Sequence, residues 1–412
     1  MGSSTRRFLI AGLSVLSAMA SFAASTKPVT AETRPHSSAA TAYEFKKRES
    51  NDIAATVVVS GISCTCARFA EDIRNVVNDL SPEGLRILPV LGNGGLQNLK
   101  DVLFLRNLDM AVVDEDNMRL LKKQDPALYS SIEQRVQYIT KLYNSEFQVL
   151  ARNDIKSYGD LKGKRVNFNL KESQTEVTAE TVFNDLKISV QRTNYDNDEA
   201  LKRLISGDIS AMIILTGAPQ VTLSSVKKED GVHFLPLDQA SVPSREAGDL
   251  FSHYLPAELT HEQYPKLIAE GETVPTIANR ALLVAYAWPE ESQRYKRLAK
   301  FVDTFFSRID QFNSPSRHPK WKEVNLAADM PGWTRFKAAA EWLAAHRGQQ
   351  VPTNGDQAAS DQNATALKAA FETFIQNYVA STGGQALSVQ QREALFEQFK
   401  KFLAQRRASS AG

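Results

Sequence analysis

The feature that most constrains the fold of this 412-residue chain is a repeated alternation of short apolar runs with amphipathic segments. Residues 56–59 (Thr-Val-Val-Val) have the pattern of a buried strand, and apolar residues between 69 and 80 recur at helical spacing. Two further strands are predicted at 86–90 and 110–113, with a glycine turn and a helix between them. Strands that alternate with helices predict a parallel-rich sheet covered by helices, which is an α/β fold.

A second set of these elements begins near residue 145. Strands are predicted at 147–151, 163–168, 211–215 and 233–237, and helices at about 177–186 and 200–205. A third stretch adds a strand at 281–286 and an amphipathic helix at 295–306. Two α/β units of about a hundred residues each predict two lobes, and we expect the third stretch to return to the first lobe.

These elements divide the chain into five parts. We expect a signal peptide (1–23), a linker (24–52), lobe 1 (53–145 and 272–330), lobe 2 (146–271) and a helical C-terminal extension (331–412). In the extension, helices are predicted at 331–347 and after residues 367 and 388. The extension either packs on the lobes or serves as a docking arm for a partner.

The N-terminus has the pattern of a secretory signal peptide. Arg6 and Arg7 precede an apolar run over residues 8–20, and small residues follow as far as Ala23. This pattern predicts cleavage after Ala23 and a periplasmic location, by a general or a twin-arginine route; a short membrane anchor is the alternative. Residues 24–52 are rich in Ser, Thr, Ala and charge, so we expect them to be mostly disordered.

The charge and the motifs exclude several function classes. Arg6 and Arg7 account for the net charge of +2, so the chain without its leader has 47 basic and 47 acidic residues. A neutral chain without basic stripes argues against nucleic-acid binding. The six histidines are scattered and no H-E-x-x-H, G-x-S-x-G or phosphate-binding glycine-lysine loop occurs, so we expect no enzyme, cofactor or metal. We interpret the acidic cluster at residues 114–116 as a solvated loop rather than an acid/base pair.

Several motifs occur in the order typical of one family. They are Ser60-Gly61, residues 92–99 (Gly-Asn-Gly-Gly-Leu-Gln-Asn-Leu), 108–113, 158–166 (which contains Asp-Leu-Lys-Gly-Lys-Arg-Val), 207–211 and 216–219. Over residues 54–312 the chain resembles the TAXI family of TRAP-transporter solute receptors, which belong to the type II periplasmic-binding-protein superfamily. The resemblance implies a two-lobed receptor that delivers a small carboxylate, such as glutamate, glutamine or a dicarboxylic acid, to a TRAP-type membrane permease.

The chain departs from that family at three places. Residues 172–175 are Glu-Ser-Gln-Thr where the family has a glycine-rich turn, and residues 62–66 are Ile-Ser-Cys-Thr-Cys where it has glycine and tyrosine. Residues 331–412 have no counterpart in the family core. The side chains added at residues 172–175 put the family's usual ligand in doubt.

Candidate ligand-binding residues follow from where strands end. In open α/β sheets, ligands bind outside the carboxyl ends of the strands, where helices begin and their N-termini favour a carboxylate. On this basis we expect the ligand to contact Ser63, Thr65, Arg68, Asn93, Gly94, Gly95, Gln97, Asn98, Tyr143, Ser173, Gln174, Thr175, Thr216 and Pro219. The alternatives are that Thr65, Asn93 and Ser173 only cap helices, that Arg68 is simply exposed and that Tyr143 only packs.

Cys64 and Cys66 are the two cysteines of the chain. In an oxidising compartment two cysteines normally pair, but a bridge across a single residue is strained and reducible. A disulfide, two free thiols and a redox or copper site therefore remain three alternatives.

These observations predict a non-enzymatic solute-binding receptor for a transporter, with no nucleic-acid partner. The alternative is a sensory protein that presents its ligand to a membrane signalling partner, because such a protein needs the same cleft between two lobes.

Overall fold

The computed structural model describes residues 38–79, 81, 84–242 and 250–346. The predicted signal peptide, the first part of the predicted linker and the C-terminal extension beyond residue 346 lie outside these residues. Residues Ser38–Asp52 form helix α1, so the prediction of disorder is wrong for them. The reason is composition, because this segment contains Ala, Glu, Lys and Arg, which favour helices, and no proline. The description below concerns the unit from Arg48 onward.

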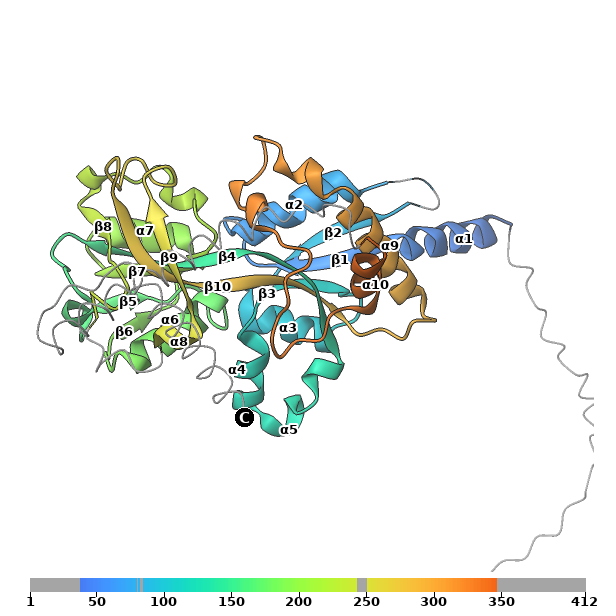
Figure 1. The fold of residues 1–412 in the computed structure, drawn as a ribbon, viewed down its shortest axis with the longest axis horizontal. Coiled ribbons are helices and arrows are strands. Elements are labelled where there is room, and N and C mark those ends of the chain that lie inside the picture. Colours follow the sequence, from blue (N-terminus) through green and yellow to red (C-terminus); the bar gives the residue numbers. More distant parts are fainter. Residues whose placement is uncertain (1–37, 80, 82–83, 243–249, 347–412) are drawn as a thin grey trace, which may run out of the picture. The chain divides into compact units, whose positions relative to one another are not determined.

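Within the described residues, ten strands form one mixed sheet (Figure 1). The strands are β1 Ala54–Val59, β2 Arg86–Leu91, β3 Met110–Asp114, β4 Val136–Arg152, β5 Arg165–Asn167, β6 Gln191–Thr193, β7 Ala211–Thr216, β8 Val232–Phe234, β9 Leu255–Thr260 and β10 Thr273–Tyr286. Their order is β2-β1-β3-β10-β4-β7-β5-β6, with β8 on β4 and β9 on β10. The outer strands of each lobe are parallel, whereas β4 and β10 are antiparallel to their neighbours.

Strands β4 and β10 pass through both lobes. The first part of β4 pairs with β10 beside β3, and its second part pairs with β7. Along β4, Tyr143 packs in the core of lobe 1 and Phe147 packs in that of lobe 2. Along β10, Ile277 belongs to the core of lobe 2 and Ala281 to that of lobe 1. The two lobes therefore share a continuous pair of strands at their junction.

Helices cover both faces of the sheet. The α-helices of the unit are α2 Thr65–Val77, α3 Gly95–Phe104, α4 Asn117–Gln124, α5 Pro126–Tyr129, α6 Gln174–Asp185, α7 Asn197–Ile205, α8 Leu250–His253, α9 Gln293–Ser307 and α10 Lys337–Ala345. Short 3-10 helices are η1 Ile132–Gln134, η2 Tyr158–Leu161, η3 Val221–Leu223, η4 Lys228–Asp230, η5 Ile309–Asn313 and η6 Pro319–Glu323. Among the helices of the described residues, none combines the length and the apolar composition of a membrane-spanning segment.

Alternating strand residues build separate cores on the two faces of each lobe. In β1, Val57 and Val59 pack beneath α2, α9 and α10, whereas Val58 packs against α3 and α4 on the opposite face (Figure 1). In β7, Ile213 packs under α6 and Ile214 under α7. This arrangement confirms the predicted two-lobed α/β fold.

Three predicted elements begin at clearly different residues in the structure. Strands β4 and β10 begin well before the apolar runs that predict them, at Val136 and Thr273. Helix α10 begins at Lys337 rather than at residue 331, because the backbone of Thr334 and Phe336 is hydrogen-bonded to Tyr138 of β4. Through Phe336 this described part of the extension packs on the core of lobe 1.

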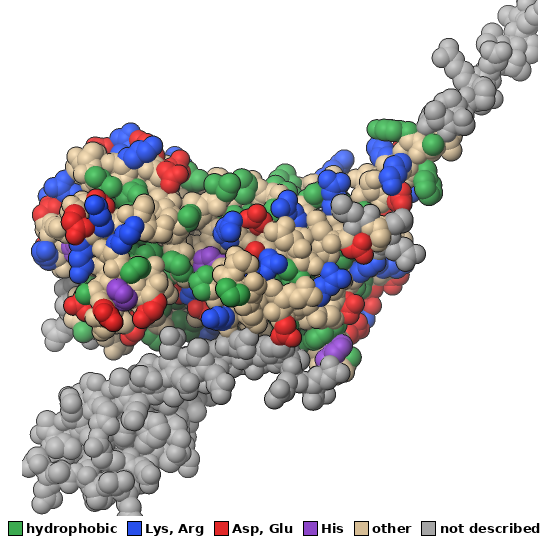
Figure 2. All heavy atoms as spheres, turned by 90° about the horizontal axis from the view of Figure 1, so that it is seen from above, with side chains coloured by type: hydrophobic (Ala, Val, Ile, Leu, Met, Phe, Trp, Pro, Cys, Tyr) green, Lys and Arg blue, Asp and Glu red, His purple; other side chains and the backbone are tan. Residues whose placement is uncertain are grey.

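Charged side chains on the surface are mixed in sign. On the face drawn in Figure 2, Lys and Arg side chains of the described residues lie among Asp and Glu side chains. This face therefore has the mixed charge that the neutral composition predicts.

Candidate functional site

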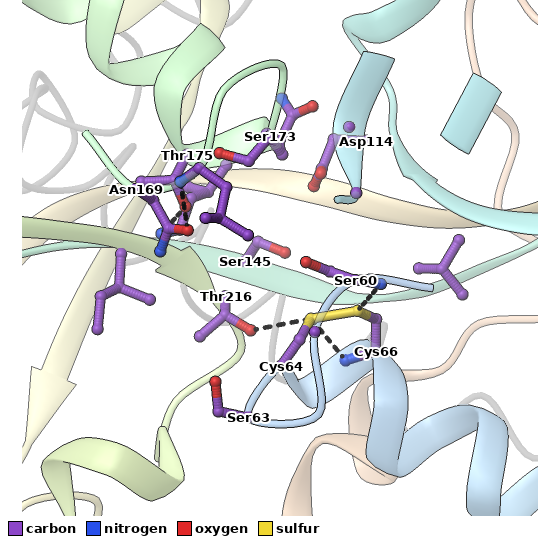
Figure 3. A pocket seen from close by; sticks show the side chains of 18 of the residues that line it. Ser60, Ser63, Cys64, Cys66, Asp114, Ser145, Asn169, Ser173, Thr175 and Thr216 are labelled. Atoms are coloured by element: carbon purple, nitrogen blue, oxygen red, sulfur yellow. Dashed lines mark hydrogen bonds between the residues drawn. A yellow bond between two sulfur atoms is a disulfide. The ribbon is translucent and has the colours of Figure 1, made fainter. Parts of the chain in front are cut away.

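A cavity of about 90 Å³ lies at the junction of the two lobes (Figure 3). Its walls come from the carboxyl ends of β1, β3, β5 and β7 and from the middle of β4 and β10. This is the place that the strand-end rule predicts for a ligand. One water needs roughly 10–15 Å³ of such space, so the cavity has room for a small solute.

Three helices begin at the cavity wall. The N-cap residues of α2, α3 and α6 are Cys64, Gly94 and Ser173, and all three line the cavity. Helix N-termini carry partial positive charge. Among the described residues that line the cavity, none is Lys, Arg or His. The helix ends therefore supply the positive potential of this site.

Eight of the predicted ligand-binding residues line the cavity. They are Ser63, Gly94, Gly95, Tyr143, Ser173, Gln174, Thr175 and Thr216. Two of the predicted turns also meet across the lobes, because a Cβ built on Gly95 would lie 2.5 Å from the backbone nitrogen of Gln174. Ser173 both caps α6, accepting from Glu176 N at 3.2 Å, and faces the cavity, so capping and lining are not exclusive.

Four predicted residues lie near the cavity but do not line it. Thr65 is buried between the lobes, where its hydroxyl donates to Gly217 O at 2.6 Å and its amide to Thr216 Oγ1 at 3.2 Å. Asn98 is buried and supports the glycine turn, accepting from Gly94 N at 3.1 Å and donating to Val112 O at 3.2 Å. Asn93 and Gln97 are half-buried outside the cavity lining.

Arg68 and Pro219 border a different hollow. This second space, of about 810 Å³, is also lined by Ile62, Val221 and His318. Arg68 is exposed and pairs with Glu71, one helical turn on, at 2.9 Å. This agrees with the alternative that Arg68 is simply an exposed residue. Within the described residues, Arg68 is thus no part of the cavity between the lobes.

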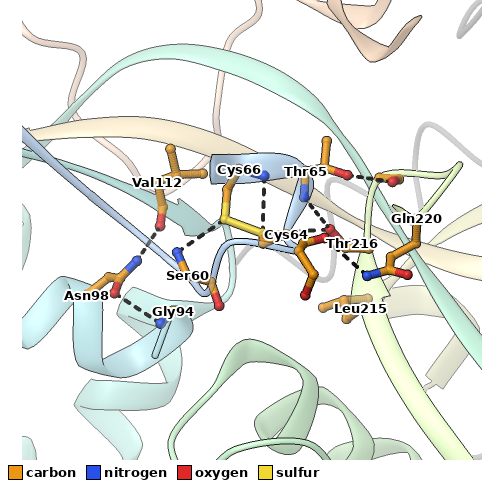
Figure 4. Close-up of a disulfide and its surroundings, with 12 residues drawn as sticks. Ser60, Cys64, Thr65, Cys66, Gly94, Asn98, Val112, Leu215, Thr216 and Gln220 are labelled. Atoms are coloured by element: carbon orange, nitrogen blue, oxygen red, sulfur yellow. Dashed lines mark hydrogen bonds between the residues drawn. A yellow bond between two sulfur atoms is a disulfide. The ribbon is translucent and has the colours of Figure 1, made fainter. Parts of the chain in front are cut away.

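The cysteines are joined by a disulfide at the start of α2 (Figure 4). Both line the cavity, and Cys66 Sγ accepts from Ser60 N at 3.2 Å. Cys64 Sγ lies 3.7 Å from Thr216 Oγ1 of lobe 2. Of the three alternatives that the sequence leaves open, the structure contains the disulfide, and it shapes the wall of the cavity. The part of the chain that the structure describes has no cluster of three or more metal-binding side chains.

Several polar lining residues are absent from the predicted set. They are Ser60, Asp114, Ser145, Asn169, Asp196 and Asn197. Ser60, Asp114 and Asn169 lie at or just after strand ends, so the strand-end rule could have found them. Ser145 could not be found in this way, because it lies within β4, in a part of the strand that has no apolar pattern.

The acidic cluster is not a solvated loop, and that interpretation is wrong. Asp114 ends β3 and is 8% exposed, because β3 lies between β1 and β10. Asp116 is equally buried and accepts from Gln174 Nε2 at 3.0 Å, whereas Glu115 contacts Arg280 at 2.8 Å. Burial raises the pKa of Asp114 well above its ordinary value, and the charge of Asp116 raises it further.

A second buried charged group lies at the same junction, on β4. The two oxygens of Glu146 accept from Lys320 Nζ and, at 2.8 Å, from Ala218 N of lobe 2. Lys320 also contacts Glu323 at 2.6 Å. Burial by itself would lower the pKa of Lys320, but the carboxylates of Glu146 and Glu323 raise it above its ordinary value. Lys320 therefore stays charged within this buried group.

Comparison with known proteins places this architecture in a family. The model of the NMT1-like family matches residues 82–332, which is more than half of the chain. The comparison with curated proteins finds no match.

Solved structures that resemble the chain include three binding proteins. One is the substrate binding protein of an amino acid ABC transporter (13% identity, TM-score 0.38, 63% of this chain and 93% of that chain). Another is the periplasmic aliphatic sulphonate binding protein SsuA from Escherichia coli (14%, 0.36, 82% and 91%). The third is the alkanesulfonate-binding protein SsuA from Xanthomonas axonopodis pv. citri, bound to MOPS (12%, 0.38, 63% and 75%). By its match over residues 82–332, the chain belongs to the NMT1-like family.

Proposed function

We propose that this protein is an extracytoplasmic solute-binding protein that encloses a small carboxylate-bearing molecule between its lobes and delivers it to a TRAP-type membrane permease. The observation that supports this proposal most is the convergence of three helix N-termini, at Cys64, Gly94 and Ser173, on one cavity. Such helix ends bind anions through their amides and their dipoles.

Contacts between the lobes support a role in enclosing a ligand. On one side of the cavity, Gln220 Nε2 donates to Ser63 O at 3.1 Å, and Asn197 Nδ2 donates to Ser63 Oγ at 3.0 Å. On the other side, Gln174 contacts Asp116 and Asn117. We infer that the lobes open and close by hinge motion about β4 and β10, as two-lobed binding proteins do.

The test is a thermal-shift screen of the purified protein against small carboxylates and their neutral amides. A ligand that binds only the folded state should add about 3–4 kcal/mol at 100 to 1,000 times its dissociation constant. Because helix N-termini favour negative charge, each acid should bind better than its amide. Equal binding of acids and amides would contradict the carboxylate part of the proposal.

A matched pair of glycine variants tests whether binding needs closed lobes. Gly95→Ala places a Cβ against the backbone of Gln174 across the junction, and overpacking of this kind costs about 1–3 kcal/mol. We expect ligand binding to weaken about ten- to a hundredfold. Gly163→Ala has a similar positive φ (73° against 54°) but nothing within 4 Å of the added carbon, so it controls for backbone strain. Equal affinities of the two variants would contradict enclosure between the lobes.

A further inference from the structure

One carboxylate that lines the cavity has an oxygen without a hydrogen-bond partner among the described residues. Asp114 lines the cavity and is 8% exposed. Among the described residues, its Oδ1 is a buried side-chain oxygen without a hydrogen-bond partner. Figure 3 shows this side chain at the end of β3, on the side of the cavity where Ser60 and Ser145 also lie.

Three cations of the lobe junction, Arg280, Lys141 and Lys320, contact groups other than Asp114. The guanidinium of Arg280 contacts both oxygens of Glu115 at 2.8 Å. Lys141 Nζ donates to Glu323 O at 2.9 Å, and Lys320 lies between Glu146 and Glu323. Asp114 therefore has no counter-charge among the described residues that line the cavity.

A structural role does not explain this arrangement. Asp114 has a hydrogen-bonding neighbour in the side chain of Ser145, but burying a carboxylate without a counter-charge is unfavourable, and buried charges in stable folds are paired or bind a ligand. Neighbouring Asp116 also has one bonded oxygen, Oδ1, which accepts from Gln174, and one without a partner among the described residues, Oδ2, but it does not line the cavity. Asp114 differs from Asp116 in that it lines a cavity with room for a solute.

Resting on the proposed function, we infer that Asp114 selects the ligand by accepting a hydrogen bond from a nitrogen donor, preferably a protonated amine. The preferred ligand then carries an amine for Asp114 and a carboxylate for the helix N-termini. A dicarboxylate without an amine is rejected, because its second negative charge would face Asp114 in a desolvated site.

The other possible chemistry is that Asp114 is protonated and donates to an oxygen of an anionic ligand. The raised pKa of Asp114 is compatible with both arrangements, so a substitution must separate them. Asparagine has nearly the same shape, carries no charge and can donate. The Asp114→Asn variant should therefore bind an amine more weakly than the parent does and bind an anion equally well.

The experiment is calorimetric titration at neutral pH with pairs of compounds that differ only in an amine. Suitable pairs are glutamate with glutarate, aspartate with succinate, and alanine with propionate. For the parent, the member with the amine should bind at least tenfold more tightly. Asp114→Asn should lower the affinity for the member with the amine by about ten- to a hundredfold, the effect of losing a hydrogen bond to a charged group. Its affinity for the member without the amine should stay the same or increase.

Asp303→Asn is the matched control, because it makes the same change at an exposed position on α9, and its titrations should match those of the parent. Two results would overturn the inference. One is a parent that binds the amine-free member as tightly; the other is an Asp114→Asn variant that keeps the parent's affinity for the amine.

If no carboxylate binds, the carboxylate part of the proposed function is contradicted. The inference about Asp114 is then tested with other compounds. The probes are then ethanolamine and putrescine, which have amines and no carboxylate. Binding that Asp114→Asn abolishes and Asp303→Asn preserves would support the inference. Failure of these amines to bind the parent would end it.

Discussion

Two buried carboxylates at the lobe junction, Glu146 and Asp114, have opposite surroundings. Glu146 is 4% exposed, and both of its oxygens are bonded within the protein, to Lys320 and to the amide of Ala218. Asp114 is 8% exposed, lines the cavity and keeps one oxygen without a partner among the described residues. Among the described residues, the protein supplies partners for both oxygens of Glu146 but not for both oxygens of Asp114. This is the difference expected between a charge that stabilises the fold and a charge that binds a ligand.

The strongest test of the structural side of this comparison removes the cation. Lys320→Met leaves Glu146 buried without its positive partner, so we expect the free energy of unfolding to fall by about 3–5 kcal/mol. Urea unfolding measures this loss. The double variant Lys320→Met with Glu146→Gln removes both charges and should recover most of it. A single variant that loses less than about 1 kcal/mol would show that Glu146 does not depend on this pair.

The same junction explains where prediction from sequence stops. Strands β1 and β3 and helix α9 could be predicted, because residues such as Val58 and Phe305 repeat at the period of their element. The first half of β4 could not, because Lys141 and Glu146, which contact η6, interrupt the apolar pattern. Buried polar residues thus hide the strand that carries them.

The candidate site divides in a similar way. The turns at Gly94 and Ser173 could be predicted, since a glycine turn or a capping residue before a helix is a local signal. The burial of Asp114 could not, because it depends on β1 and β10, which lie far away in the sequence. The support that Asn98 gives to the glycine turn likewise depends on Val112 of another strand.

A smaller effect of opposite sign is expected on the ligand side of the comparison. Asp114→Asn replaces an unpaired buried carboxylate by a neutral amide of nearly the same shape, so the unliganded protein should gain about 1–3 kcal/mol of stability at neutral pH. Urea unfolding without ligand measures this gain. A clear loss of stability would mean that Asp114, like Glu146, is needed for the fold.

The stability gained by Asp114→Asn should also depend on pH. The groups around Asp114 are Glu115 and Asp116, Tyr143 on β4, and Arg280 on β10, which contacts Glu115. Because burial raises the pKa of Asp114 in the folded state, its contribution to stability is fully present below the unfolded-state pKa of about 4 and is lost as the pH rises through the raised value. The difference in stability between Asp114→Asn and the parent should therefore grow with pH. A difference that stays constant with pH would contradict a titrating Asp114.

The smallest effect on stability is expected at the disulfide, which borders the cavity without joining the lobes. The bridge between Cys64 and Cys66 closes a loop with one residue between the cysteines, and so short a loop restricts the unfolded chain little, by no more than about 1–2 kcal/mol. Replacing both cysteines with Ser should thus lower the melting temperature by only a few degrees. Since Cys64 and Cys66 line the cavity, the variant should instead change ligand affinity. Reductant should reproduce both effects in the parent and leave the double-Ser variant unaffected. Unfolding of the protein in either experiment would show that the disulfide is needed for the fold rather than for the shape of the cavity.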